Sequence, residues 1–141
     1  MKKAIILFII MITLFACKND KQKDEKITGD KVILISNELF TTSPNDPLII
    51  SNATLENDSL KISFGASGCD SKSWIIELIG SEDILKSNPP QRSIRLSLKN
   101  NEACQAALGR TITFDLKPAR ISEGEIILNL QGWQSPITYI Y

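Results

Sequence analysis

The sequence predicts an all-β domain, a single antiparallel β-sandwich of about seven or eight strands with an immunoglobulin-like or related topology. Three observations favour this class. Apolar and polar residues alternate in most segments after residue 30, and turn residues recur about every 8–14 positions. The part of the chain available for folding, about 112 residues, is the size of one domain. Lipocalin-like barrels share the strand count but usually need more residues, so the sandwich is favoured.

The first element is a secretion signal in residues 1–16. Lys2-Lys3 precedes the apolar run Ala4–Phe15, which is too short for a permanent transmembrane helix of about 20 residues. The run ends in Leu14-Phe15-Ala16-Cys17, which resembles the lipobox of bacterial lipoprotein signal peptides, although Phe15 is bulkier than usual at its position. We therefore expect cleavage before Cys17 and acylation of that residue, palmitate included. The alternative is an ordinary secreted protein in which Cys17 has no role.

Residues 17–29 are interpreted as the lipidated cysteine and a flexible tether. Residues 18–26 contain no apolar side chain, so they cannot join a core. Lysine and acidic residues directly after the cysteine are typical of surface-export signals. The sequence therefore predicts a lipid-anchored protein of the outer membrane, with the surface face favoured over the periplasmic face. Sixteen basic residues balance sixteen acidic ones without a basic stripe, which argues against a nucleic-acid partner.

The sandwich domain is expected to span residues 30–141. Lys31–Ser36 is a short apolar run, which predicts a strand covered on both faces. Asn57-Asp58, a turn pair that tolerates positive φ, predicts a hairpin between two strands. The strands expected from alternation are Leu48–Glu56, Ser59–Phe64, Trp74–Ile79, Ser93–Lys99, Thr111–Leu116, Glu125–Leu130 and Ser135–Tyr141, and the segments Ser81–Lys86 and Asn101–Leu108 are interpreted as helical turns.

Two of these strands carry more specific expectations. In Ser93–Lys99 we expect Ile94, Leu96 and Leu98 on the core side and the serine, arginine and lysine side chains exposed. The chain ends inside the last strand, so Tyr139 and Tyr141 are expected to fix the C-terminus to a sheet.

The three cysteines divide into one anchor and one pair. If Cys17 is lipidated, Cys69 and Cys104 remain as an even number of thiols in an oxidising compartment, where disulfides persist. A bridge between them would close a loop of about 35 residues and contribute about 3–4 kcal/mol. Two buried free thiols are the alternative.

Catalytic and metal-binding patterns are weak. The chain has no histidine, which excludes Ser-His-Asp and Cys-His arrangements. Gly65-Ala66-Ser67-Gly68-Cys69 approaches a nucleophile elbow, but Cys69 replaces the second glycine, so we interpret the segment as a bend. A pair of carboxylates for glycoside hydrolysis could still meet in space. The oxygen-rich turns Asn45-Asp46, Asn57-Asp58, Asp70 and Asn101-Glu102 are better explained by turn preference than by calcium binding. We expect no enzyme, no metal and no cofactor.

Two loop residues are candidates for binding a partner. Arg92 follows the rigid pair Pro89-Pro90 and could offer a planar, multi-donor head to a carboxylate or a glycan oxygen. Trp133 lies in a turn between two strands and could offer a flat apolar face, whereas Trp74 is in phase with core residues. If both loops lie at one end of the sandwich, Arg92 and Trp133 would form one patch. The alternatives are a strand-entry bend for the prolines and a lid over the core for Trp133.

Several segments together resemble a group of small, uncharacterised exported lipoproteins of Bacteroidota. These segments are Gly68-Cys69 with Trp74, Pro89–Leu96, Cys104-Gln105-Ala106 and Phe114-Asp115-Leu116, within residues 48–141. The resemblance implies a β domain with two cysteines and supplies no activity. Relatives carry histidines near both cysteines, where this chain has Lys72-Ser73 and Asn100-Asn101, so a metal or catalytic role would not transfer.

The sequence as a whole favours a non-catalytic binding or assembly module of the cell envelope, anchored to the membrane through Cys17. Its partner would be an envelope protein or a glycan. The alternative is a small inhibitor or immunity-type protein that blocks an exported enzyme, because a rigid loop on a stapled domain suits that role.

Overall fold

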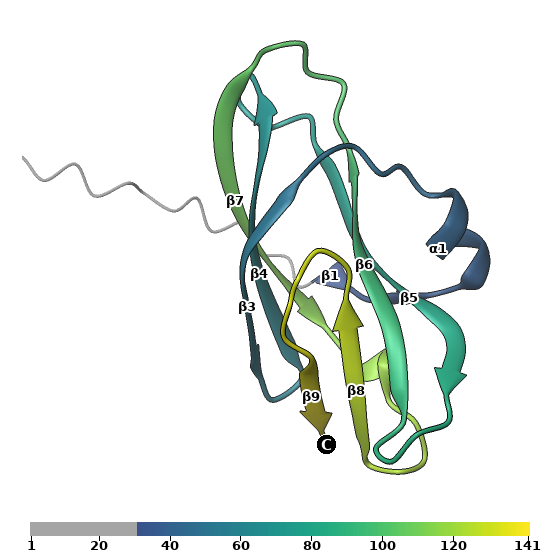
Figure 1. Cartoon of the computed structure of the whole chain (residues 1–141). Coiled ribbons are helices and arrows are strands. Elements are labelled where there is room, and N and C mark those ends of the chain that lie inside the picture. The colour runs from purple at the N-terminus through teal and green to yellow at the C-terminus, as the bar shows by residue number, and fades with distance from the viewer. Residues whose placement is uncertain (1–30) are drawn as a thin grey trace, which may run out of the picture.

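The computed structural model describes residues 31–141, which form two packed β-sheets (Figure 1). The four-stranded sheet has the order β1 (Lys31–Val32), β7 (Ala106–Asp115), β4 (Ser59–Gly68) and β3 (Ile49–Glu56). The five-stranded sheet has the order β2 (Leu34–Ile35), β5 (Ile75–Leu85), β6 (Gln91–Lys99), β8 (Glu125–Leu130) and β9 (Ile137–Ile140). A short helix, α1 (Asn37–Thr42), and a 3-10 turn, η1 (Lys117–Ala119), complete the fold. The all-β sandwich is therefore confirmed.

One apolar core fills the space between the sheets. Its residues sit at alternate positions of the strands, as the period of two requires for a half-buried sheet. The largest contributors are Leu60, Ile62 and Phe64 in β4, Ile76 and Leu78 in β5, Ile94, Leu96 and Leu98 in β6, Phe114 in β7, Ile126, Leu128 and Leu130 in β8, and Tyr139 in β9. No helix among residues 31–141 is long and apolar enough to cross a membrane.

The β3–β4 hairpin confirms the turn expected at Asn57-Asp58. Asn57 has φ 53°, the left-handed conformation that asparagine adopts more readily than most residues. The two strands pair in antiparallel register from this turn, with one bulge near Ser51.

The strand pairing is mixed rather than wholly antiparallel. Four pairs are antiparallel, namely β3/β4, β4/β7, β5/β6 and β8/β9, but β1/β7, β2/β5 and β6/β8 are parallel. The reason is connectivity. Between β6 and β8 the chain crosses to the other sheet to form β7, and such a crossover returns the chain in the original direction.

The N-terminal strand differs from the expectation of one strand covered on both faces. Lys31–Ile35 forms two short strands that belong to different sheets, and Ile33 between them is buried. Val32 and Leu34, which flank it, are 47% and 37% exposed. The run of apolar residues here marks a change of sheet: Ile33 is buried in the core, Ile35 packs against it, and Val32 and Leu34 remain exposed.

Both helical turns expected from the sequence are wrong. Ser81–Lys86 falls almost wholly within β5, whose pairing with β6 is irregular between Gly80 and Ile84. Asn101–Leu108 is a loop only up to Gln105, and its last three residues begin β7. The helix lies instead at Asn37–Thr42, where the Ser36 hydroxyl caps it by accepting a hydrogen bond from Leu39 N–H at 3.2 Å.

This helix covers part of β6 that alternation assigned to solvent. Arg95 and Ser97 are 5% and 3% exposed. The Arg95 guanidinium donates to the main-chain carbonyls of Phe40 at 2.7 Å and Ser43 at 2.8 Å, and the Ser97 hydroxyl donates to that of Pro44 at 2.7 Å. Arg95 and Ser97 occupy outward positions of β6. They can be buried because they donate hydrogen bonds to carbonyl groups at the end of α1.

Candidate functional site

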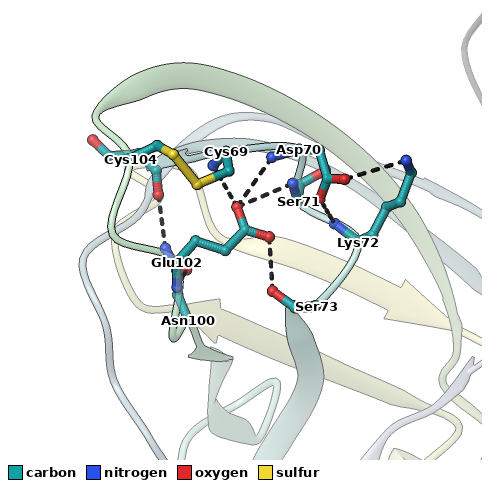
Figure 2. The surroundings of a disulfide bond; sticks show 9 residues. Cys69, Asp70, Ser71, Lys72, Ser73, Asn100, Glu102 and Cys104 are labelled. Carbon is teal, nitrogen blue, oxygen red and sulfur yellow. Dashed lines mark hydrogen bonds and ion pairs between the residues drawn. A yellow bond between two sulfur atoms is a disulfide. The ribbon is translucent and has the colours of Figure 1, made fainter.

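The expected pair of cysteines forms a disulfide in the structure. Cys69 directly follows β4 and Cys104 precedes β7, and their Cα atoms are 4.8 Å apart. Both residues are exposed. The bond ties the β4–β5 loop to the β6–β7 loop at one end of the sandwich (Figures 1 and 2). We call residues 69–73 and 100–105 the disulfide apex.

A carboxylate inside the disulfide apex holds the two loops together a second time (Figure 2). Oε2 of Glu102 accepts hydrogen bonds from three consecutive main-chain N–H groups, those of Cys69 at 2.5 Å, Asp70 at 3.2 Å and Ser71 at 3.2 Å. Its Oε1 accepts the Ser73 hydroxyl at 2.7 Å. Burial acts to raise the pKa of Glu102, but these four hydrogen bonds outweigh it and lower the pKa to about 2.

Further hydrogen bonds fix the loop backbone. Arg110 Nη1 donates to the Ser71 carbonyl at 2.6 Å, and Asn100 Nδ2 donates to the Ser67 carbonyl at 2.7 Å. Asp70 accepts from Lys72 N–H at 3.0 Å, and this main-chain hydrogen bond is the largest cause that lowers the pKa of Asp70. The loops are therefore preordered although their side chains face solvent. The exposed positions are Cys69, Asp70, Lys72, Ser73, Asn101, Ala103, Cys104 and Gln105.

Glycine is required beneath the disulfide apex. A Cβ added to Gly68 would lie 2.5 Å from Glu102 Oε2 and 2.9 Å from Trp74 Cζ2, closer than real contacts allow. Trp74 is 6% exposed and its ring centroid lies 6.1 Å from that of Phe64, so the expectation of a core tryptophan beside the disulfide is confirmed. Gly65–Cys69 is not the bend expected from the sequence, because Gly65–Gly68 continue β4 in register with β7 and only Cys69 lies in the loop that follows.

Arg92 does not lie in an exposed loop, and this expectation is corrected. It is the second residue of β6, only 6% exposed, and its guanidinium donates to the Ser81 carbonyl. Its position has the same parity as Ile94, so the side chain runs along the inner face of the sheet, close to Gly80. Burial without a carboxylate partner lowers the pKa of Arg92.

Trp133 is half-buried and lines an open groove of about 300 Å³ at the β8–β9 turn. It does not share a patch with Arg92. Arg92 is buried and is not among the residues that line this groove, although its neighbour Ser93 is. The proposed joint patch is therefore wrong, and Trp133 remains as a groove residue.

The predicted lipidation site and tether, Cys17 and residues 17–29, lie outside the described residues, as does the signal peptide. Within residues 31–141, no group of three or more histidine, cysteine, aspartate or glutamate side chains is placed to hold a metal ion. The Glu102 carboxylate, which lies in one of the oxygen-rich turns, accepts its hydrogen bonds from the protein itself.

A polar cluster at the other end of the sandwich was not expected from the sequence. Asp58, in the β3–β4 turn, accepts hydrogen bonds from the Tyr139 hydroxyl at 2.5 Å and from Arg120 Nη2 at 2.5 Å. These two hydrogen bonds lower the pKa of Asp58, while burial and the Asp58 carboxylate raise that of Tyr139 to about 12. The cluster fixes β9 to the opposite sheet, which confirms that Tyr139 anchors the C-terminus. The only feature of the sequence that indicated this anchoring role was the position of Tyr139 near the end of the chain.

Comparisons with known proteins give the fold but no family. No protein-family model and no curated protein sequence matches the chain. Solved structures that match the chain include the following three. A DUF1344 protein of unknown function from Bacteroides vulgatus has TM-score 0.52 and 18% identity over 79% of this chain and 55% of that one. A NigD-like immunity protein from Bacteroides caccae has TM-score 0.60 and 9% identity over 79% of this chain and 64% of that one.

The third structure is a putative toxin-related protein from Parabacteroides distasonis, with TM-score 0.49 and 16% identity over 77% of this chain and 60% of that one. The chain thus spans about 55–64% of the length of the structures it matches. At these identities the likeness is one of fold: the described domain is similar to small β proteins of Bacteroides species.

Proposed function

We propose that this protein is a lipid-anchored, non-catalytic binding module of the cell envelope, and that the disulfide apex is the surface that holds its protein partner. The observation that carries the proposal is the combination of exposure and order in the apex. Its outward side chains are free to make contacts, while the backbone is held by the Cys69–Cys104 bond and by the four hydrogen bonds of Glu102.

Preordering matters because binding usually has to immobilise the loops it uses. Each side chain that is fixed on binding costs about 0.5–1.5 kcal/mol, and an unordered backbone costs more. In the disulfide apex the backbone part of this cost is met when the protein folds. Such loops are typical of proteins that bind partners as rigid bodies. The anchor at Cys17, proposed from the lipobox, would hold the apex near partners in the same membrane.

An immunity-type inhibitor is the second candidate. The observation that favours it is the shared fold with the NigD-like immunity protein from Bacteroides caccae, at TM-score 0.60. An inhibitor and an assembly module would use the same rigid surface. They differ in what happens to the partner, because an inhibitor abolishes the partner's activity and an assembly module leaves it intact.

Site-specific photo-crosslinking in intact cells tests the proposal. A photoreactive amino acid would replace Asn101 or Gln105 on the apex and, as a control, the exposed Lys61 of β4. We expect one shared crosslinked protein from both apex positions and none from Lys61. The same product should be lost when Cys69 and Cys104 are changed to serine. Equal products from Lys61, or none from the apex, would overturn the proposal.

The crosslinked partner then separates the two candidate functions. Its activity would be measured with and without the full-length chain at equimolar concentration. Loss of activity supports an immunity-type inhibitor, and unchanged activity supports an assembly module. Protease treatment of intact and lysed cells would show which face of the outer membrane carries the domain, with cleavage in intact cells expected for the surface face.

A further inference from the structure

The groove at the β8–β9 turn combines an aromatic residue with uncharged polar residues. It occupies about 300 Å³, within the lower range of ligand sites. One aromatic residue, Trp133, lies among uncharged hydrogen-bonding side chains, and no charged residue lines it. The polar residues that line it are Ser93, Asn129, Gln131, Gln134 and Ser135.

The backbone around the groove is fixed before any ligand arrives. Gln131 N–H donates to the Ile94 carbonyl at 2.9 Å, which ties the start of the turn to β6. Trp133 N–H donates to the Leu130 carbonyl at 3.1 Å. Gly132, which lies between them, has φ 79°, the left-handed conformation that this turn needs. The indole is therefore held on an ordered turn, with part of it packed against the core, as the lid alternative expected, and part of it left accessible at the groove.

One amide in the groove also has a fixed orientation. Asn129 Nδ2 donates to Oε1 of Gln91 at 2.9 Å across the β6–β8 pair. This hydrogen bond sets which atom of the amide faces away from Gln91, and so leaves Oδ1 to accept from a ligand. Ligand sites generally combine aromatic side chains with a few polar groups of fixed orientation.

We propose that this groove binds a neutral saccharide. A sugar ring has hydroxyl groups around its rim, which amide and hydroxyl side chains can bind, and an apolar C–H face that packs on an indole. A charged ligand would lose its hydration and gain no counter-charge, because no charged side chain lines the groove. The groove is separate from the disulfide apex, so this inference goes beyond the proposed partner contact and does not depend on it.

Binding can be measured on the full-length chain, purified in a detergent that has no sugar headgroup. An array of neutral and acidic oligosaccharides, with unstructured peptides as the other class of ligand, identifies what is bound. Isothermal titration then gives the affinity for the strongest neutral oligosaccharide. Tryptophan fluorescence adds a local readout, because the chain has two tryptophans and Trp74 is buried in the core.

We expect neutral oligosaccharides to bind and Trp133→Ala to weaken them at least tenfold, with partial recovery in Trp133→Phe. Gln134→Ala should weaken binding several-fold, and its matched control Asn88→Ala, which removes an exposed amide from the β5–β6 loop, should not. A thermal melt checks that each variant is folded. If Trp133→Ala does not fold, Gln134→Ala still tests the inference. Binding of acidic sugars or peptides alone, no binding at all, or equal effects of Gln134→Ala and Asn88→Ala would overturn the inference.

Discussion

Changing both Cys69 and Cys104 to serine would remove a covalent link between positions 35 residues apart. In the loop-entropy description, closing a loop of that length lowers the entropy of the unfolded chain by about 13 cal/mol/K, which is about 4 kcal/mol at 25 °C. Both side chains are exposed, so the serine hydroxyls stay hydrated and leave no cavity in the folded state. We therefore expect the free energy of unfolding to fall by about 4 kcal/mol and the melting temperature by about 15–20 °C.

Urea unfolding followed by tryptophan fluorescence measures this change, since the buried Trp74 reports the loss of the core. The wild type with the bond reduced should match the double serine variant, which separates the loss of the bond from the effect of the substitution. A loss below about 1 kcal/mol, with oxidised and reduced wild type equally stable, would refute the reasoning. It would mean that Cys69 and Cys104 are not joined in the folded protein or do not restrict the unfolded chain.

The pKa of Glu102 is about 2 instead of 4.5, so the stability that it contributes is complete above pH 4.5 and is lost as the pH falls towards 2. Glu102→Gln should flatten the dependence of melting temperature on pH in that window. Tyr139→Phe should lower the free energy of unfolding by about 2 kcal/mol in urea, because it removes the hydrogen bond to the charged Asp58. Mass spectrometry should show an acylated Cys17 at the mature N-terminus, and Cys17→Ser should release the protein or leave it uncleaved.

The strand positions could be predicted from the sequence because a period of two survives in most strands. Glu125–Leu130 matches β8 at both ends, and the hairpin at Asn57 is correctly placed. With Cys17 set aside as the lipidation site, two cysteines remained, and this count was enough to pair Cys69 with Cys104. These features depend on neighbouring residues or on a count, so a single sequence carries them.

The remaining features depend on contacts between distant residues. Arg92 and Arg95 both lie in β6, but Arg95 lies under α1 and Arg92 lies on the inner face of the sheet. The alternation of polar and apolar residues does not show that a helix covers Arg95. Arg92 was expected in an exposed loop because it follows Pro89-Pro90. Its carbonyl partner, Ser81, is set by the irregular pairing of β5 and β6, which the sequence does not reveal. Glu102 resembled an ordinary turn residue, since its four donors lie about 30 positions earlier.

The change of sheet at Ile33 has a mechanical consequence. β1 hydrogen-bonds to β7 of one sheet and β2 to β5 of the other, with one residue between them. The anchor proposed at Cys17 lies upstream, so tension on the tether enters the domain through these five residues, Lys31–Ile35. Both short strands run parallel to their neighbours, and a pull along the chain loads the two sets of hydrogen bonds in shear. The force is therefore distributed over both layers of the sandwich instead of peeling a strand from one edge.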